Sequence, residues 1–183
     1  MKNTLWVKII IPVLIVAVIG VMWFVKNQPS ASELIIVTDP TIDQLDGADF
    51  SLNATELIDY EALAEYGLPI IVDYGADSCV PCKQMAPVLQ TLNAEMQGKA
   101  FIKFVDVWQH YEAAANVPIQ LIPSQVIFNP DGTPYEPSGE LVDQIGGFKM
   151  YSDQESGQHI FTVHEGGLTE KQMRLILAEM GVE

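Results

Sequence analysis

The stretch Asp77-Ser78-Cys79-Val80-Pro81-Cys82-Lys83 contains both cysteines of this 183-residue chain. Covalent redox chemistry within one chain must therefore use this pair. If a helix begins here, the two-residue spacing places the first thiol at the helix end and the second about one turn inside. A proline is tolerated in the first turn, where its missing N–H costs nothing. We therefore expect Cys79 to be the exposed sulfur and Cys82 the sheltered one.

The position expected for Cys79 also makes it the attacking sulfur. The first amide N–H groups of a helix have no partner within the helix, and they lie at the positive end of its dipole. Both features favour the thiolate, which is the nucleophilic form of cysteine. Lys83 adds a positive charge nearby.

Other roles for a C-x-x-C pair fit this sequence less well. Structural zinc usually needs four ligands, and His110, His159 and His164 form no second paired cluster. Covalent haem attachment needs a histidine directly after the second cysteine, where Lys83 stands. An inert disulfide remains open, although so short a loop removes little entropy from the unfolded chain. We expect a redox-active pair that uses no metal and no cofactor.

An apolar segment near the N-terminus suggests a membrane anchor. Seventeen uncharged, mostly aliphatic residues, Ile9–Val25, lie between Lys8 and Lys26. As a helix they reach the lower limit for crossing the hydrocarbon core of a bilayer. Trp6 and Trp23 lie near the two ends, where tryptophan prefers the membrane interface. The segment therefore predicts a single membrane span.

A cleaved signal peptide is the competing interpretation of this segment. Its apolar core would normally be shorter, and Ser30-Ala31-Ser32 is an unconvincing cleavage site. We therefore expect a retained anchor in residues 1–27, followed by a short polar linker in residues 28–32. More positive charge precedes the span than follows it, so the N-terminus should stay in the cytoplasm and the domain should be exported. Disulfides persist outside the cytoplasm of most cells.

The charge of the chain is distributed unevenly. All 24 acidic residues follow Gln28, together with six of the nine basic ones, which gives this part a net charge of −18. Such a surface is a poor partner for nucleic acid. We interpret the acidity as a source of solubility.

Residues 33–183 have the order of helices and strands that is typical of an α/β domain with a central mixed sheet. Apolar runs and turn residues predict five strands, at Glu33–Thr38, Asp49–Leu52, Pro69–Tyr74, Phe101–Val107 and Ile122–Phe128. Apolar stripes and caps predict four helices: from Asn53 or Thr55 to Gly67, from the cysteines to Gly98, over Gln109–Asn116, and from Thr169 to Gly181. Thr169 and Gln172 have the spacing of a capping box.

The pattern is weakest in an extended segment at about residues 135–160. We expect two short strands around it, Leu141–Ile145 and Ile160–His164, which could form a hairpin or border an extended loop. Outside this segment, Trp108 is expected to be a partly buried packing residue, with a substrate contact as the alternative.

Three motifs in this order resemble those of a membrane-anchored thioredoxin family protein. They are Val72-Asp73-Tyr74, then Cys79-Val80-Pro81-Cys82-Lys83, and some forty residues later Ile122-Pro123-Ser124. The resemblance covers about residues 49–132 and the terminal strand and helix. It implies a thioredoxin-like α/β fold, with a central mixed sheet flanked by helices and the dithiol at the start of a helix.

The resemblance also implies roles for single residues. Pro123 matches the family's proline that follows a cis peptide bond, so Ile122 and Pro123 should lie beside the dithiol and hold substrate backbone. Asp73 matches the family's buried carboxylate behind the second cysteine. Burial would raise its pKa, so that it could accept the proton of Cys82. The alternative for Asp73 is a strand-end aspartate that only hydrogen bonds to the backbone.

The sequence departs from the family at a few places. Gly75 and Ser78 stand where thioredoxins usually have tryptophans, so the surface around Cys79 should be less aromatic. Many members have a lysine beside the buried aspartate, but counting back from Pro123 places Phe104 at that position. Lys103 is therefore not assigned this role.

The resemblance implies an exported thiol-disulfide oxidoreductase. It would reduce protein disulfides through Cys79 and Cys82, form a Cys79–Cys82 bridge, and be re-reduced by a transmembrane electron-transfer protein. Val80-Pro81 resembles the Gly-Pro pair of reducing thioredoxins. Two alternatives stay open: a reductase specific for apocytochromes before haem attachment, and a non-catalytic module that binds a partner.

Overall fold

The computed structural model describes residues 45–182. The predicted anchor (residues 1–27), linker (residues 28–32) and first strand (Glu33–Thr38) lie outside this range. Within residues 45–182, no helix combines the length and the apolar character needed to cross a bilayer.

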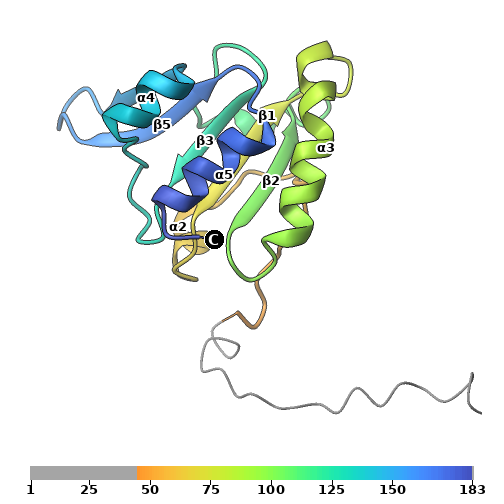
Figure 1. Ribbon diagram of the computed structural model, residues 1–183, viewed down its shortest axis with the longest axis horizontal. Coiled ribbons are helices and arrows are strands. Elements are labelled where there is room, and N and C mark those ends of the chain that lie inside the picture. The colour runs from red at the N-terminus through yellow and green to blue at the C-terminus, as the bar shows by residue number, and fades with distance from the viewer. Residues whose placement is uncertain (1–44, 183) are drawn as a thin grey trace, which may run out of the picture. The chain divides into compact units, whose positions relative to one another are not determined.

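A five-stranded sheet organises the described residues (Figure 1). The strands lie in the order β2-β1-β3-β5-β4, where β1 is Ile70–Gly75, β2 Phe101–Asp106, β3 Ser124–Phe128, β4 Phe148–Ser152 and β5 His159–Glu165. β1 is parallel to β2, and the other three pairings are antiparallel. The predicted mixed sheet is therefore confirmed. All six residues of β1 are buried, as a continuous apolar run in a central strand requires.

Helices cover both faces of this sheet. They are α2 (Tyr60–Ala64), α3 (Val80–Glu95), α4 (Gly139–Ile145), α5 (Glu170–Glu179) and the short 3-10 helix η1 (Tyr111–Ala114). Apolar side chains of α3, α4 and α5 pack on one face, and those of α2 and η1 pack on the other. Figure 1 shows α3 and α5 as neighbours, and an Arg174–Glu95 ion pair of 2.6 Å joins them.

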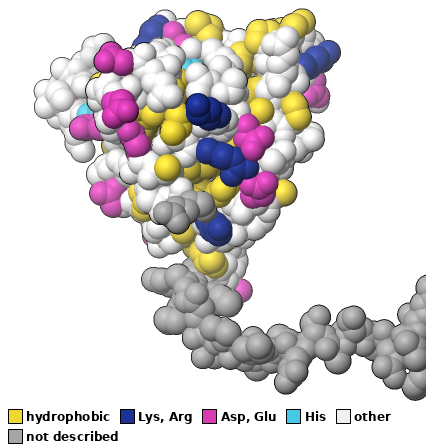
Figure 2. Space-filling model, viewed as in Figure 1, with side chains coloured by type: hydrophobic (Ala, Val, Ile, Leu, Met, Phe, Trp, Pro, Cys, Tyr) yellow, Lys and Arg dark blue, Asp and Glu magenta, His cyan; other side chains and the backbone are white. Residues whose placement is uncertain are grey.

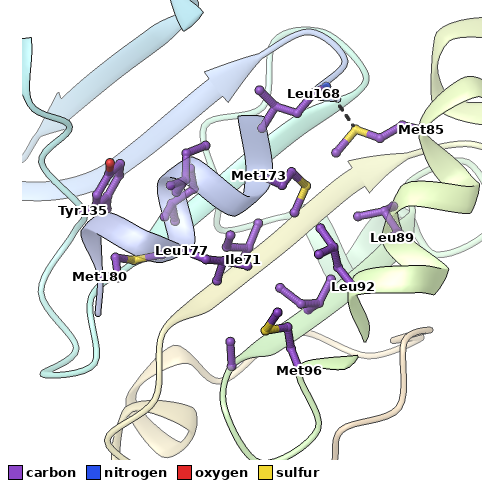
Figure 3. Packing of buried hydrophobic residues seen from close by; sticks show 14 of the residues in the cluster. Ile71, Met85, Leu89, Leu92, Met96, Tyr135, Leu168, Met173, Leu177 and Met180 are labelled. Carbon is purple, nitrogen blue, oxygen red and sulfur yellow. Dashed lines mark hydrogen bonds between the residues drawn. The ribbon is translucent and has the colours of Figure 1, made fainter. Parts of the chain in front are cut away.

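The core between α3, α5 and the sheet follows the predicted apolar stripes. Figure 3 shows Met85, Leu89 and Leu92 of α3 directed toward the same core as Met173 and Leu177 of α5. Charged side chains of both signs lie on the outer surface of this side, with small apolar areas between them (Figure 2). The helices are therefore held by their buried faces and solvated on their outer ones.

The last helix begins as the sequence predicts. The Thr169 side chain accepts a hydrogen bond from the backbone N–H of Gln172, and the Gln172 side chain accepts one from the backbone N–H of Thr169. This reciprocal pair is the predicted capping box. It fixes the register in which Met173, Ile176 and Leu177 face the core.

The predicted strand at Leu141–Ile145 is wrong, because this segment belongs to helix α4. Ser138 caps the helix by accepting from Leu141 N–H, and Gly146 ends it at a positive φ of 70°. The strand that pairs with β5 comes later, at Phe148–Ser152, so β4 and β5 do form a hairpin.

Two predictions before β1 also need correction. Asp49–Leu52 forms no strand, and its neighbour Asn53 makes only an isolated bridge to Phe104 of β2. The next helix is shorter than predicted, because α2 begins after Asp59, whose side chain accepts a hydrogen bond from Ala62 N–H. The cap of this helix is thus Asp59 rather than Asn53 or Thr55.

Candidate active site

The two cysteines lie at the N-terminus of α3. Cys79 is the residue that precedes the first turn, and Pro81 lies inside that turn. A disulfide joins Cys79 to Cys82, with their Cα atoms 5.3 Å apart. The Cys79 sulfur accepts a hydrogen bond from the backbone N–H of Cys82 at 3.3 Å. An amide at the positive end of the helix dipole therefore points at this sulfur, as the sequence predicts for the start of a helix.

The two sulfur-bearing residues differ in exposure. Cys79 is half-buried, whereas Cys82 is only 4% exposed. A substrate disulfide can approach Cys79 from solvent, but it cannot approach Cys82 in the same way. This asymmetry matches what the C-x-x-C spacing predicts.

The loop before β3 lies against the exposed sulfur. The peptide bond between Ile122 and Pro123 is cis. The carbonyl oxygen of Ile122 lies 3.9 Å from the Cys79 sulfur, which carries no proton in the disulfide state. Ser124 stabilises the loop by donating from its hydroxyl to the carbonyl oxygen of Leu121 at 2.8 Å. The chain therefore presents backbone atoms of Ile122 directly beside Cys79.

Asp73 is fully buried in β1, on the face of the sheet that carries α3. Its Oδ1 accepts a hydrogen bond from Gln125 Nε2 at 2.6 Å, whereas its Oδ2 is buried without a partner. Burial raises the pKa of Asp73 to about 7, although the Gln125 hydrogen bond acts in the opposite direction. Such a group can exchange a proton near neutral pH.

Gly75 lies close to both the Asp73 carboxyl group and the sheltered Cys82. A Cβ atom at this glycine would lie 3.3 Å from Asp73 Oδ2 and 3.3 Å from the Cβ of Cys82. It would also lie 2.9 Å from the Phe104 ring, which is closer than real Cβ atoms approach other atoms. The unpartnered carboxylate oxygen and Cys82 therefore border the same space, and only glycine leaves this space free.

Lys103 and Phe104 lie where the counting from Pro123 predicts. In the register of β1 and β2, Asp73 is opposite Phe104 and Val72 is opposite Lys103. The Lys103 ammonium group contacts Asp49 Oδ2 and the Ser51 carbonyl oxygen, each at 3.1 Å. Its contacts are thus with the segment before α2 and not with Asp73.

Sequence reasoning missed two polar residues behind Asp73. Gln125 of β3 and His164 of β5 are buried, and their side chains are joined by a hydrogen bond of 2.7 Å between Gln125 Oε1 and His164 Nδ1. Each lies within or at the end of an apolar strand run, and this position indicates a buried polar side chain. A polar side chain in a buried strand needs a hydrogen-bond partner, so its partner could have been sought on a neighbouring strand.

Trp108 was predicted to be a packing residue, and this is wrong. The residue is 64% exposed. Asp106 explains this, because its carboxylate accepts hydrogen bonds from the backbone N–H groups of Trp108 and Gln109 and so turns the chain outward after β2. Trp108 and Ile122 border the same pocket of about 310 Å³, together with Val107, Ala114, Ile119, Gln120 and Leu121.

A second pocket, of about 400 Å³, borders the sheltered cysteine. Cys82, Lys83 and Phe104 contribute to its wall, as do residues 52–55. One pocket is therefore bordered by Ile122, whose carbonyl oxygen lies beside Cys79, and the other by Cys82 itself, and the two differ in character. The first is mostly apolar, whereas the second includes the polar side chains of Asp77, Asp106, Gln109 and His110.

Comparison with known proteins gives the same family as the motifs. The family model described as "Thioredoxin" matches residues 56–146. Among solved structures, the chain is similar to Fasciola hepatica thioredoxin, with a TM-score of 0.48 and 23% identity over 71% of this chain and 99% of that one. It is also similar to a chloroplastic thioredoxin z, with a TM-score of 0.45 and 23% identity over 69% of this chain and 94% of that one.

Thioredoxins of Staphylococcus aureus strains, among them Mu50 and N315, are 37% identical to this chain over 91 residues. The alignment covers 50% of this chain and 79% of those relatives. The region that the family model matches includes the dithiol, the buried aspartate and the proline loop. The chain therefore belongs to the thioredoxin family and is a thiol-disulfide oxidoreductase.

Proposed function

We propose that this chain is an exported, membrane-tethered reductase of protein disulfides. The observation that carries the proposal is the difference between the two sulfurs: Cys79 is accessible and contacted by a helix N-terminal amide, whereas Cys82 is sheltered beside the free oxygen of Asp73. An attacking sulfur needs access and a stabilised thiolate, and a resolving sulfur needs proximity and a proton acceptor.

The first step is the attack of the Cys79 thiolate on a substrate disulfide. A new S–S bond forms between Cys79 and one substrate sulfur, and the other substrate sulfur leaves as a thiolate. The amide of Cys82, 3.3 Å from the Cys79 sulfur, stabilises the thiolate before the attack. In the same step, Ile122 and Pro123 hold the substrate backbone beside the mixed disulfide.

The second step releases the substrate. Asp73 accepts the thiol proton of Cys82, and the Cys82 thiolate attacks the sulfur of Cys79. The mixed disulfide breaks, the second substrate thiolate leaves, and the Cys79–Cys82 bridge remains. The substrate gains two electrons and the dithiol loses two. A carboxyl group with a pKa of about 7 is suited to this transfer near neutral pH.

The oxidised dithiol must be reduced again before the next cycle. We propose that a transmembrane electron-transfer protein supplies the two electrons, and that residues 1–27 tether the domain to the same membrane. Tethering both proteins to one membrane raises the effective concentration of the domain near its electron donor. The apolar run Ile9–Val25 between lysines supports the tether, and the more positive N-terminal flank supports export of the domain.

Reduction of insulin by the full chain, with dithiothreitol as the electron source, tests the catalytic proposal. Cys79→Ser should abolish the activity, and Cys82→Ser should form stable mixed disulfides with substrates. Equal rates for the wild type and Cys79→Ser would refute the proposal. Identification of the proteins trapped by Cys82→Ser separates a general reductase from one specific for apocytochromes, which would be the only proteins trapped in the second case.

Fractionation of cells tests the tether. The full chain should sediment with membranes, and a chain that lacks residues 1–27 should not. A membrane-impermeant maleimide should label the reduced cysteines in intact cells if the domain is exported. Recovery of both chains in the soluble fraction would contradict the tether, and labelling only after lysis would contradict export.

The apolar pocket beside Ile122 offers a contact for protein substrates. Trp108 on its wall is exposed, so a substrate chain that lies beside Ile122 can cover the indole. Trp108→Ala should raise the KM for insulin about tenfold, since loss of such an aromatic contact costs on the order of 1–2 kcal/mol. A small disulfide such as DTNB should react at an unchanged rate. Tyr111 is also exposed but does not line this pocket, so Tyr111→Ala is the matched control.

A further inference from the structure

Three buried polar residues form a row across the middle of the sheet. Asp73 is directly opposite Gln125 in the pairing of β1 with β3, and Gln125 is directly opposite His164 in the pairing of β3 with β5. Their side chains are joined by hydrogen bonds of 2.6 Å and 2.7 Å. Each of the three is at most 4% exposed. The row starts behind the dithiol and runs away from it, through the core.

When Asp73 is ionised, the chemistry of the row fixes its hydrogen atoms. The carboxylate of Asp73 can only accept, so the neighbouring atom of Gln125 must be the amide nitrogen. The amide oxygen then faces His164 Nδ1 and can only accept, so the proton of the imidazole lies on Nδ1. Burial lowers the pKa of His164 to about 4, which keeps the ring neutral near pH 7.

While Asp73 is ionised, the amide of Gln125 is therefore held from both sides. If it turned over, its oxygen would face the carboxylate and its nitrogen would face the imidazole N–H, and both contacts would be repulsive. Met85 Sδ adds a third contact, 3.4 Å from the amide nitrogen. One oxygen of Asp73 thus accepts from a fixed donor, and the other oxygen of Asp73, which borders Gly75 and Cys82, has no partner.

We propose that Gln125 and His164 are positioning residues of the disulfide exchange: they hold one oxygen of Asp73 so that the other stays free and directed toward Cys82. This inference rests on the proposed role of Asp73 as proton acceptor. When Asp73 takes the proton, the S–H bond of Cys82 breaks and an O–H bond forms at Oδ2. Gln125 continues to donate to Oδ1, and the proton is later lost to water.

The surroundings of the row leave Asp73 as its only group that titrates near pH 7 in the disulfide state. Within residues 45–182, the side chains that face Asp73 from β2, β3 and α3 are Phe104, Gln125 and Cys82, and none of these is charged when the disulfide is formed. Near His164 the charged residue is Glu165, whose carboxylate pairs with Lys149 at 2.7 Å.

The Gln125 hydrogen bond stabilises the carboxylate form of Asp73, so its loss should raise the pKa of this group. Gln125→Met keeps the length of the side chain but removes the donor. The pKa of Asp73 should then rise by about one unit or more, since a hydrogen bond to a charged group contributes on the order of 1.5–3 kcal/mol. Insulin reduction should slow at pH 7 and recover at pH 9.

A pair of variants at the far end of the row isolates the role of His164. His164→Asn keeps an N–H donor for Gln125. His164→Leu introduces a side chain of nearly the same size as asparagine but without a donor. The asparagine variant should retain the wild-type pH profile, and the leucine variant should shift in the same direction as Gln125→Met. Thr162→Val removes a buried hydroxyl on the same face of β5, so it controls for destabilisation alone.

Two readouts on the full chain complete the test. The first is the pH dependence of insulin reduction, and the second is the pH at which the carboxyl carbon of Asp73 titrates by NMR, assigned with Asp73→Asn. An unchanged titration of Asp73 in Gln125→Met and His164→Leu would overturn the inference. An equal shift in Thr162→Val would also overturn it. The NMR readout does not depend on activity, so failure of the inference is distinguishable from failure of the proposed reductase function.

Discussion

Both faces of the central sheet carry a buried apolar cluster, but they differ in what they bury beside the active site. On the face that carries α3 and α5, the row Asp73, Gln125 and His164 interrupts an apolar core. On the opposite face, Val72 and Val126 occupy the alternating positions beside this row. The same three strands thus present a polar line on one side and an apolar layer on the other.

The opposite face also contains buried hydroxyl groups: those of Tyr60 and Tyr74 satisfy each other, whereas that of Tyr151 has no hydrogen-bond partner. The hydroxyl groups of Tyr60 and Tyr74 lie 2.9 Å apart. On the α3 side, the oxygen Asp73 Oδ2 of an ionisable carboxyl group is left without a partner. Burial of an unpaired polar atom costs free energy, and apolar replacements are often more stable. The α3 face therefore buries a carboxyl group beside the dithiol, where it can serve the chemistry, whereas the opposite face buries tyrosine hydroxyl groups within its apolar layer.

The largest expected effect is that of Asp73→Asn on the pH dependence of stability. Burial raises the pKa of Asp73 from 3.8 to about 7 in the folded protein. Between about pH 4 and pH 7 the folded protein therefore holds a proton that the unfolded chain has lost, so stability falls as pH rises through this window. Asparagine does not titrate. The free energy of unfolding of the variant, relative to that of the wild type, should therefore rise by up to about 4 kcal/mol between pH 4 and pH 8.

Urea unfolding of the oxidised protein at pH 5 and pH 8 measures this difference. Insulin reduction at pH 7 should decrease in the same variant, so stability and activity should change in opposite directions. Asp131 is the matched control, because hydrogen bonds from Thr133 lower its pKa. Asp131→Asn should lose stability relative to the wild type above the pKa of the unfolded chain. A stability difference for Asp73→Asn that is constant with pH would contradict our account of the α3 face.

The next effect concerns the space between Asp73 and Cys82. In Gly75→Ala, the new methyl group would lie 2.9 Å from the Phe104 ring and 3.3 Å from Asp73 Oδ2. Overpacking of this kind typically destabilises by about 1–3 kcal/mol. The free energy of unfolding should fall by this amount, and insulin reduction should slow because the carboxylate and the thiol are pushed apart.

Two further variants check that steric contact causes this loss. Phe104→Leu in the Gly75→Ala background shortens the opposing side chain and should restore part of the stability. Gly139→Ala adds a methyl group at the start of α4, where nothing lies within 4 Å. It should be neutral or stabilising by up to about 1 kcal/mol, because alanine reduces the entropy of the unfolded chain. If both alanine variants behave alike, close packing around Gly75 is not the cause.

The sequence predicted those parts of the fold that depend on local patterns. The apolar run at Ile70, the helix start at Cys79 and the capping box at Thr169 each involve residues within one turn or one strand. The helix α4 was missed, because its seven residues end at a glycine and carry only a short apolar stripe. For so short a segment, the caps decide the structure more than the pattern does.

The site was predictable to the same extent. The cysteines and Asp73 lie close together in the sequence, and their pattern is enough to propose a redox site. Gln125 and His164 are 52 and 91 positions after Asp73, and they reach it only through the order and register of three strands. Strand order is a property of the whole fold, so no local pattern indicates which buried residues will become neighbours.

The smallest effect is expected on the opposite face. Tyr74→Phe removes one hydroxyl group of the Tyr60–Tyr74 pair and should destabilise by about 1 kcal/mol, the typical contribution of one hydrogen bond. Insulin reduction should not change, because this side chain faces away from the dithiol. Thermal unfolding and the insulin assay on the same preparation give both values.

The double variant Tyr60→Phe/Tyr74→Phe sharpens this prediction. Removal of both hydroxyl groups leaves no unpaired polar atom, so the double variant should be nearly as stable as the wild type and more stable than the sum of the single changes implies. A double variant of this kind cannot be made for Asp73 Oδ2, because this oxygen has no hydrogen-bond partner that could be removed together with it. If the tyrosine pair behaved additively, or if either change slowed insulin reduction, the opposite face could not be regarded as a purely structural layer.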